Sequence, residues 1–215
     1  MRKLLLASCL LLCIASLANA TVVNVKVTGV VDYNVIGGGM TGTQSGTPTT
    51  VSFNVDSNNF VDSGSFPTRG YVIDLNSFSM TVGAVPVPVV IPQPDGTPYF
   101  VMRNNDPAVD GFFISQGNVD FPFALAVTIP GLVPQHELDC QVSYDTGAMW
   151  TSLDIMDALG TYDQSHLASY YWAIGRFGNP GAEYVYQTIT LSTVPEPATA
   201  LFFLPCAMLV TRRRK

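Results

Sequence analysis

The fold is decided by the stretch Val23-Asn24-Val25-Lys26-Val27-Thr28, in which apolar and polar side chains alternate strictly. The stretch Val51-Ser52-Phe53-Asn54-Val55 repeats this alternation further along the chain. A period of two is typical of a strand with one buried and one solvated face. Such strands favour an antiparallel sheet, because strands of a parallel sheet are apolar on both faces.

Further segments with strand character follow, separated by clusters of Gly, Pro and Asn that predict turns. They are Tyr71–Val82, Tyr99–Arg103, Phe112–Gln116, Phe123–Ile129, Leu138–Tyr144, Tyr170–Phe177 and Glu183–Thr193. The apolar positions of the first change parity at Asn76-Ser77, which predicts a β-bulge there. Residues 152–159 predict a short helix or a wide loop. Strands at this spacing predict an all-β domain, an antiparallel β-sandwich with the jelly roll as one form.

The composition agrees with a β domain and argues against nucleic-acid binding. Only 12% of the residues are charged, and the chain contains 18 Gly and 15 Pro. Residues 21–193 hold 15 acidic and 4 basic side chains, which gives this part a formal charge of −11. Because such a surface repels phosphate backbones, nucleic acid is not expected as a partner.

The N-terminus has the three parts of a secretory signal peptide. Basic residues at positions 2 and 3 precede an apolar run over Leu4–Leu17, and Ala18 and Ala20 form a small-residue exit. This pattern predicts a signal helix over residues 1–20, cut after Ala20. A lipoprotein cleavage box ending at Cys9 is the alternative, but cleavage there would leave most of the apolar run behind the cysteine.

The C-terminus has the pattern of a stop-transfer segment. Pro195, Glu196 and Pro197 precede an apolar stretch over Ala198–Val210. Four basic residues close the chain: Arg212, Arg213, Arg214 and Lys215. The positive-inside rule keeps the basic end cytoplasmic, so the β domain faces outward. As a helix the 13 apolar residues reach about 20 Å, less than the ~30 Å hydrocarbon core, which suits a temporary anchor.

Together the signal peptide, the Pro195-Glu196-Pro197 motif, the apolar run and the basic end resemble the PEP-CTERM sorting signal. The resemblance covers the last 22 residues, 194–215, and implies nothing about the chemistry of the β domain. In that family an exosortase, a membrane protease or transpeptidase, cuts at or near the motif and passes the protein to the cell surface or the exopolysaccharide matrix. A plain C-terminal anchor that contains Pro-Glu-Pro by accident is the alternative.

Two Asp-Ser/Thr-Gly triplets, at Asp62-Ser63-Gly64 and Asp145-Thr146-Gly147, suggest aspartic-type hydrolysis. In such enzymes two facing carboxylates share a proton and activate water. The alternative is a pair of turns, since an Asp side chain that bonds its own backbone makes a good strand end. The chain is also short for a two-lobed protease. We expect turns, and no catalytic residue is assigned.

Cysteine and histidine offer little chemistry. Cys140 alone among the four cysteines belongs to the β domain, and its phase with apolar neighbours predicts a small core residue. His136 is expected in a turn and His166 in a polar loop, both at the surface.

Acidic loops suggest weak calcium sites without completing a loop consensus. Carboxylate and amide oxygens are the ligands that Ca²⁺ prefers. The candidates fall in two clusters, Asp56 and Asp62 with Asn58 and Asn59, and Asp106 and Asp110 with Asn104 and Asn105. Solvated turns are the expected alternative. Calcium is therefore a candidate cofactor, and no metal ligand is assigned.

Aromatic side chains cluster in the last two strand segments. Tyr170, Trp172, Tyr184 and Tyr186 are expected to share the face opposite Ile174, Val185 and Ile189. Exposed rings on that face would stack on sugars, whereas cross-strand pairs that only stabilise the sheet would give the same pattern.

The sequence as a whole predicts a signal peptide (1–20), a β domain (21–193) and a sorting tail (194–215). The expected function is that of an exported, non-enzymatic cell-surface or extracellular-matrix protein. Its expected partners are an exosortase, the membrane for a limited time, and exopolysaccharide. A carbohydrate-binding module and an aspartic-type hydrolase are the alternatives.

Overall fold

A computed structural model describes residues 21–106, 109–114, 119–133, 135–147, 149–176 and 179–195. The strands are β1 (Val22–Asn34), β2 (Pro48–Asp62), β3 (Thr68–Val82), β4 (Val85–Pro86), β5 (Tyr99–Arg103), β6 (Asp110–Ile114), β7 (Leu125–Val127), β8 (His136–Tyr144), β9 (Gly160–Tyr162), β10 (Leu167–Arg176) and β11 (Asn179–Thr193). Short 3-10 turns form at η2 (Gly38–Met40) and η3 (Ile155–Ala158). The prediction of an antiparallel all-β domain is confirmed.

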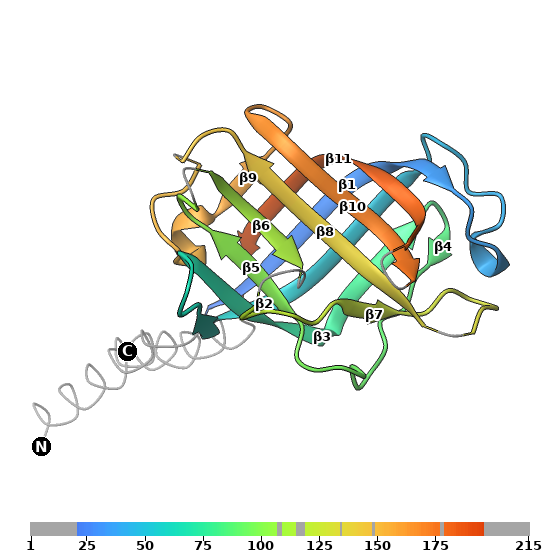
Figure 1. The fold of residues 1–215 in the computed structure, drawn as a ribbon, viewed down its shortest axis with the longest axis horizontal. Helices are drawn as coiled ribbons and strands as arrows, with labels where there is room; N and C mark the ends of the chain where they lie inside the picture. The colour runs from blue at the N-terminus through green and yellow to red at the C-terminus, as the bar shows by residue number, and fades with distance from the viewer. Residues whose placement is uncertain are drawn as a thin grey trace, which may run out of the picture.

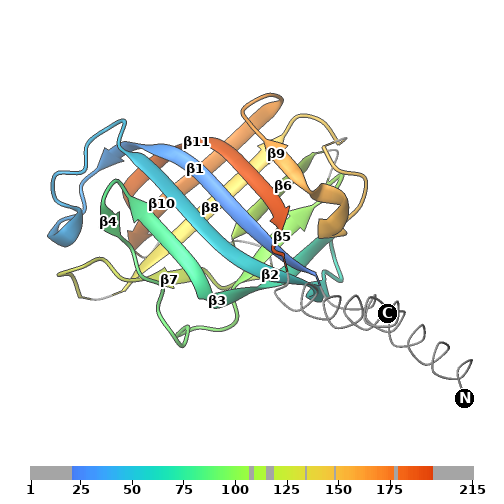
Figure 2. The same ribbon diagram turned by 180° about the vertical axis from the view of Figure 1, so that it is seen from behind.

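The main sheet closes on itself as an eight-stranded barrel. The order is β1-β2-β3-β5-β6-β8-β10-β11, and β1 pairs with β11 as well as with β2. The register runs from Val23 opposite Thr193 to Asn34 opposite Ala182. Figures 1 and 2 show the strands wrapping around a common axis. The predicted two-sheet sandwich is not confirmed. Alternation along a strand is the same in sandwiches and barrels, so it cannot predict closure.

The barrel has two distinct ends. At the terminal end, β1 begins at Val22 and β11 ends at Thr193; at the distal end, β1 ends at Asn34 and β11 begins at Asn179. Three short strands extend the barrel: β4 pairs with β3, β7 with β8, and β9 with the last part of β11. β9 takes the place of β10 there, because β10 pairs with β11 only up to Glu183.

Aromatic side chains fill the barrel interior. The predicted inward residues Val23, Val25 and Val27 are fully buried. Ring contacts then cross the lumen from Phe53 to Phe100 at 5.8 Å, from Phe100 to Phe112 at 5.7 Å, and from Phe112 to Tyr186 at 6.2 Å between centroids. Eight strands enclose an interior just wide enough for side chains to fill. The interior of this barrel is therefore a packed core.

The predicted bulge in β3 is confirmed. Ser52 faces Ser79 and Asn54 faces Asp74, so β3 holds extra residues between these two positions. The hydroxyl of Ser77 accepts a hydrogen bond from Asn54 N at 2.7 Å and donates one to Asp74 O at 2.6 Å. These bonds replace the ladder contacts that the parity change interrupts.

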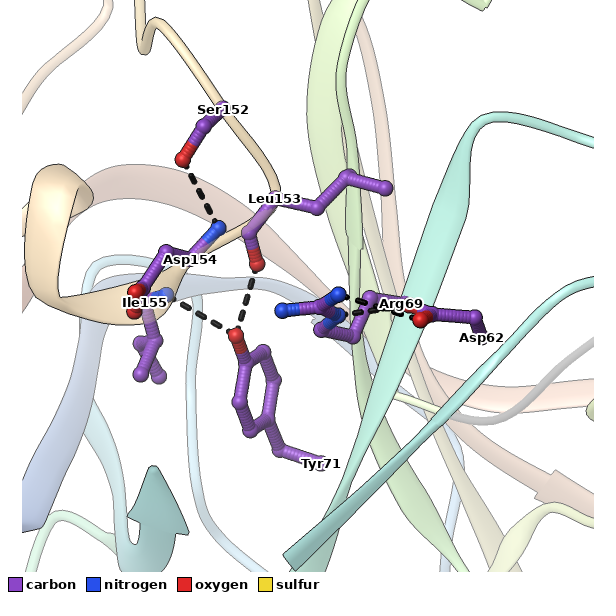
Figure 3. A network of polar contacts seen from close by, with 7 residues as sticks. All are labelled: Asp62, Arg69, Tyr71, Ser152, Leu153, Asp154 and Ile155. Atoms are coloured by element: carbon purple, nitrogen blue, oxygen red, sulfur yellow. Dashed lines mark hydrogen bonds and ion pairs between the residues drawn. The ribbon is translucent and has the colours of Figure 1, made fainter. Parts of the chain in front are cut away.

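A segment over residues 149–159 closes the terminal end. The hydroxyl of Tyr71 donates to Leu153 O at 2.6 Å and accepts from Ile155 N at 2.9 Å. Figure 3 shows Tyr71 pointing into this turn, with the side chains of Asp62 and Arg69 beside it. The segment contains η3, so the short helix expected over 152–159 is present as one 3-10 turn, capped by the side chain of Asp154.

The buried carboxylate of Asp110 fastens the same segment to the barrel. It accepts hydrogen bonds from Asn105 N at 2.9 Å, Met149 N at 2.7 Å and Trp150 N at 3.3 Å. The indole of Trp150 in turn donates to Arg103 O at 2.8 Å. One side chain thus satisfies three backbone donors that the loops would otherwise leave without a partner.

A glycine-rich loop after β1 covers the distal end. Met40 in η2 is fully buried, and Gly39 N donates to Pro130 O at 2.5 Å. The amide of Asn34 holds the loop by donating to Met40 O at 2.8 Å and to the hydroxyl of Thr43 at 2.6 Å. Among the described residues no helix is long and apolar enough to cross a membrane.

Candidate functional site on the outer wall

The aromatic face expected on β10 and β11 faces mostly the barrel interior. Trp172, Tyr184 and Tyr186 are at most 1% exposed, so the alternative of exposed rings does not hold for these three. The alternative of cross-strand pairs that stabilise the sheet holds, since the ring centroids of Trp172 and Tyr184 lie 5.1 Å apart. Trp172 pairs with Cys140 and Ile174 pairs with Leu138, and both side chains are buried in the core. The expectation that Trp172 lies on the face opposite Ile174 is therefore wrong, because residues two apart along a strand share a face. Burial raises the pKa of Tyr184.

Tyr170 is the exposed member of the predicted set, with 41% of its surface accessible. Its ring lies 6.4 Å from that of Tyr186 between centroids. Tyr170 therefore stands apart from the other three in exposure although it belongs to the same inward parity.

The opposite face of these strands carries aromatic and acidic side chains together. Tyr33 pairs with Glu183, Glu183 with Ala173, and Ala173 with Asp139, which makes one cross-strand row over β1, β11, β10 and β8. Tyr171 lies two residues before Ala173 and points to the same face. We call Tyr33, Tyr171, Ala173, Glu183 and Asp139 the outer-wall patch.

The patch is a shallow surface with exposed rings around a covered floor. Tyr33 and Tyr171 are 38% and 40% exposed, whereas Ala173 is only 2% exposed although it faces outward. The larger side chains around Ala173 therefore cover it. The phenol of Tyr33 donates to Glu183 Oε1 at 2.9 Å, which fixes the ring against the carboxylate.

The surroundings of the patch raise the pKa of both phenols. Burial against neighbouring atoms, and then the hydrogen bond to Glu183, raise the pKa of Tyr33. Burial, followed by the negative charges of Asp139 and Glu183, raises the pKa of Tyr171. Both hydroxyls thus keep their protons at neutral pH, beside two carboxylates.

Sequence reasoning missed Tyr33, Tyr171 and Glu183. Tyr170 and Tyr171 are adjacent, so the pattern of β10 alone does not say which of them faces outward. Tyr33 follows a register shift between Val31 and Tyr33, which turns it to the outer face. The adjacent tyrosine pair was the one available signal.

The structure does not bring the two Asp-Ser/Thr-Gly triplets together. Asp62 ends β2 and Asp145 follows β8, and these strands are four positions apart in the eight-stranded ring. Arg69 binds Asp62 through Nε–Oδ1 at 2.6 Å and Nη2–Oδ2 at 3.0 Å. Asp145 lies 3.5 Å from His166 Nδ1. Each carboxylate therefore has a different neighbour, and the two do not face each other.

The acidic residues considered for calcium already have protein partners. Asp56 accepts from Asn58 N at 2.8 Å, Asp62 binds Arg69, and the carboxylate of Asp110 is buried under three backbone donors. Burial lowers the pKa of Arg103, and the negative charge of Asp106 opposes that shift, so Asp106 lies near a basic group. Within the described ranges, no three His, Cys, Asp or Glu side chains converge as a metal site. Calcium binding stays a prediction.

Cys140 and the two histidines have clear positions. Cys140 is a buried free thiol, as predicted, and burial raises its pKa. His166 lies in the exposed loop expected for it. His136, expected in a surface turn, instead begins β8 and is 8% exposed, which corrects that prediction. Its even-numbered position puts it on the inward face of β8 with Leu138 and Cys140.

Two adjoining depressions open at the distal end, with volumes of about 590 and 430 Å³. Both are lined by Leu132 and His136. Ile36 and Arg176 line the larger one, and Asp95 and Glu137 line the smaller one. The lining mixes apolar and charged groups of both signs.

Most of the sorting residues lie outside the described residues, as does the signal peptide with Ala18 and Ala20. Pro195 is exposed at the end of the described chain, and Glu196, Pro197 and the basic cluster fall beyond it. No family model, no curated protein and no solved structure matches this chain.

Proposed function

We propose that the chain is an exported, non-enzymatic protein of the cell surface or extracellular matrix, sorted through its C-terminal tail by an exosortase. The barrel is the exported domain, and it serves a structural or adhesive purpose. The tail holds the protein in the membrane until the enzyme cuts near Pro195-Glu196-Pro197.

The observation that carries the proposal is the agreement between the ends of the barrel and the expected processing points. β1 begins at Val22, two residues after Ala20, and β11 ends at Thr193, two residues before Pro195. Val194 N donates to Val22 O at 2.8 Å, so the two ends lie side by side. Cleavage at both points would leave every strand and the core in place.

The spacing also sets how the barrel would stand on the membrane. Five peptide steps separate Thr193 from Ala198, where the apolar run starts, and fully extended they reach at most about 18 Å. The terminal end would therefore lie next to the lipid before cleavage, and the distal end would point away from the cell.

A non-enzymatic role is supported by the state of the reactive groups. The thiol of Cys140 is buried with a raised pKa, which disfavours the thiolate. Asp62 ends β2 and Asp145 follows β8, at opposite positions of the ring. Arg69 binds Asp62, and His166 Nδ1 lies 3.5 Å from Asp145.

Replacement of the motif in the host bacterium tests the sorting step. A chain with Pro195→Ala, Glu196→Ala and Pro197→Ala is expected to stay in the membrane fraction, with its basic C-terminus intact. The control is Thr193→Ala, an exposed change just before the motif, which is expected to be released like the natural chain. Equal release of the triple variant would contradict the proposal.

A further inference from the structure

We propose that the outer-wall patch, formed by Tyr33, Tyr171, Ala173, Glu183 and Asp139, binds glucosamine-type units of a polysaccharide, with the rings against the sugar and the carboxylates facing its ammonium group. The proposal deepens the function proposed above by naming a partner class, and rests on it for the extracellular location.

The first step is the geometry of the rings. Tyr33 and Ala173 are two strands apart, about 10 Å across the sheet. Tyr171 lies two residues from Ala173 along β10, about 7 Å away. Both rings are partly exposed, whereas Ala173, which lies in the same row, is covered. Partly exposed aromatic rings offer apolar area that the C–H faces of a pyranose can cover.

The second step is the charge of the patch. Glu183 accepts one hydrogen bond, from Tyr33, through Oε1, and no described residue donates to its Oε2. Asp139 adds a second carboxylate two strands away, and the patch contains no basic side chain. The surrounding domain carries 15 acidic and 4 basic groups. An ammonium group is attracted to this surface and a uronate is repelled.

Elsewhere on this barrel, an aromatic ring and a carboxylate together hold a cationic side chain. The guanidinium carbon of Arg69 lies 3.8 Å from the centroid of the Phe60 ring, and Asp62 binds its nitrogen at 2.6 Å. A ring face and a carboxylate acting together are a favourable cation site. The outer-wall patch offers the same pair of groups, with tyrosines in place of Phe60, to a cation from outside.

A sugar-borne ammonium fits better than a lysine or arginine side chain of a partner protein. Tyr33 and Tyr171 lie on different strands, so the units of a sugar chain can contact both rings, whereas one aliphatic side chain would cover a single ring. Hydroxyl groups of the sugar can also donate to the carboxylates. If the partner were a basic peptide, oligolysine would bind as tightly as the glucosamine oligomers.

The test measures binding of the full chain, purified in a mild detergent, by calorimetry. The probes are glucosamine oligomers, their N-acetylated counterparts, polygalacturonate and oligolysine. Glucosamine oligomers are expected to bind, and polygalacturonate is not. Tyr171→Ala is expected to weaken glucosamine binding about tenfold, whereas Tyr171→Phe, which keeps the ring, retains it.

Two further variants distinguish a specific binding site from non-specific charge attraction. Glu183→Gln is expected to reduce binding of glucosamine oligomers more than binding of the N-acetylated form, because only the former carries a positive charge. Tyr170→Ala, an exposed tyrosine on the same strand but outside the patch, is the matched control and leaves binding unchanged. Unfolding curves of each variant check that the barrel is intact.

The proposal is overturned if oligolysine binds as tightly as the glucosamine oligomers, or if Tyr171→Ala and Tyr170→Ala behave alike. It is also overturned if the glucosamine oligomers do not bind. None of these results depends on processing of the tail. Retention of the tail on extracellular protein would instead contradict the sorting function and leave the binding result intact, so the two failures are distinguishable.

Discussion

Val194 N donates a hydrogen bond to Val22 O at 2.8 Å, so the end of the described chain is joined to its first strand. This bond continues the pairing of β1 with β11, which closes the barrel and removes both sheet edges. Open edges invite pairing with other chains, and closure removes them. An exported domain cut on both sides of this bond would keep a closed sheet.

We expect residues 21–195 to fold cooperatively without the two ends. A shorter piece, 21–188, lacks the pairing of Ile189–Thr193 with β1 and of Ile189–Leu191 with β9. It is expected to lose cooperative unfolding and to aggregate, because β1 is left with open bonding groups. Denaturant unfolding followed by tryptophan fluorescence measures both pieces. Cooperative unfolding of 21–188 would contradict the role of β11 in closure.

Alkaline pH should destabilise the barrel through its buried tyrosines. The phenols of Tyr144 and Tyr186 lie 2.8 Å apart, and burial raises the pKa of Tyr144 to about 12 and that of Tyr186 as well. The folded state thus keeps protons that the unfolded state loses near pH 10. The stability that these two phenols contribute is therefore fully present below about pH 10 and is lost as the pH rises through about 12.

Phenolate absorbance measured along a pH series checks this expectation. Tyr144 and Tyr186 are expected to ionise only when the barrel unfolds, in one cooperative step. In Tyr186→Phe that step should contain one phenolate fewer. Gradual ionisation of all tyrosines around pH 10, with the barrel still folded, is the opposite result.

Loss of the Asp110 carboxylate should open the terminal end. Asp110→Ala leaves three buried or half-buried backbone donors without their acceptor. The free energy of unfolding is expected to fall by about 2–4 kcal/mol. Asp95→Ala, at an exposed position, is the control and should change it by less than about 0.5 kcal/mol. Similar losses in both variants would show that Asp110 is not a fastening point.

The hydroxyl of Tyr71 should stabilise the closing segment locally. Tyr71→Phe removes the acceptor of the buried Ile155 N and the donor to Leu153 O. We expect the free energy of unfolding to fall by about 1–3 kcal/mol. The amide of Ile155 should also exchange its hydrogen faster than in the natural chain, and faster than amides at core positions of β1. Tyr170→Phe serves as the control. Unchanged exchange at Ile155 would mean that the turn is held by other contacts.

The strands could be predicted from sequence because each has one buried face. Val23, Val25 and Val27 point inward as their alternation indicates, and the parity change at Asn76-Ser77 marks a real bulge. β5 has the predicted bounds, Tyr99–Arg103. These features depend on neighbours within one strand, and such neighbours are visible in the sequence.

Closure of the barrel could not be predicted, because it depends on pairs such as Val23 with Thr193, which are far apart in the chain. The direction of Trp172 was also missed. Large rings with polar atoms occur both at surfaces and in cores, and only the pairing of Trp172 with Cys140 decides between them. The buried position of Asp110 has the same origin, since two of its three donors, Met149 N and Trp150 N, lie about 40 residues further along the chain.

Intact-mass measurement of the mature protein, recovered from the cell surface or the medium, tests the sorting account most directly. The account predicts a chain that begins at Thr21 and ends at or near Pro195-Glu196-Pro197, without Arg212, Arg213, Arg214 and Lys215. A mature extracellular chain that still carries Lys215 would contradict it.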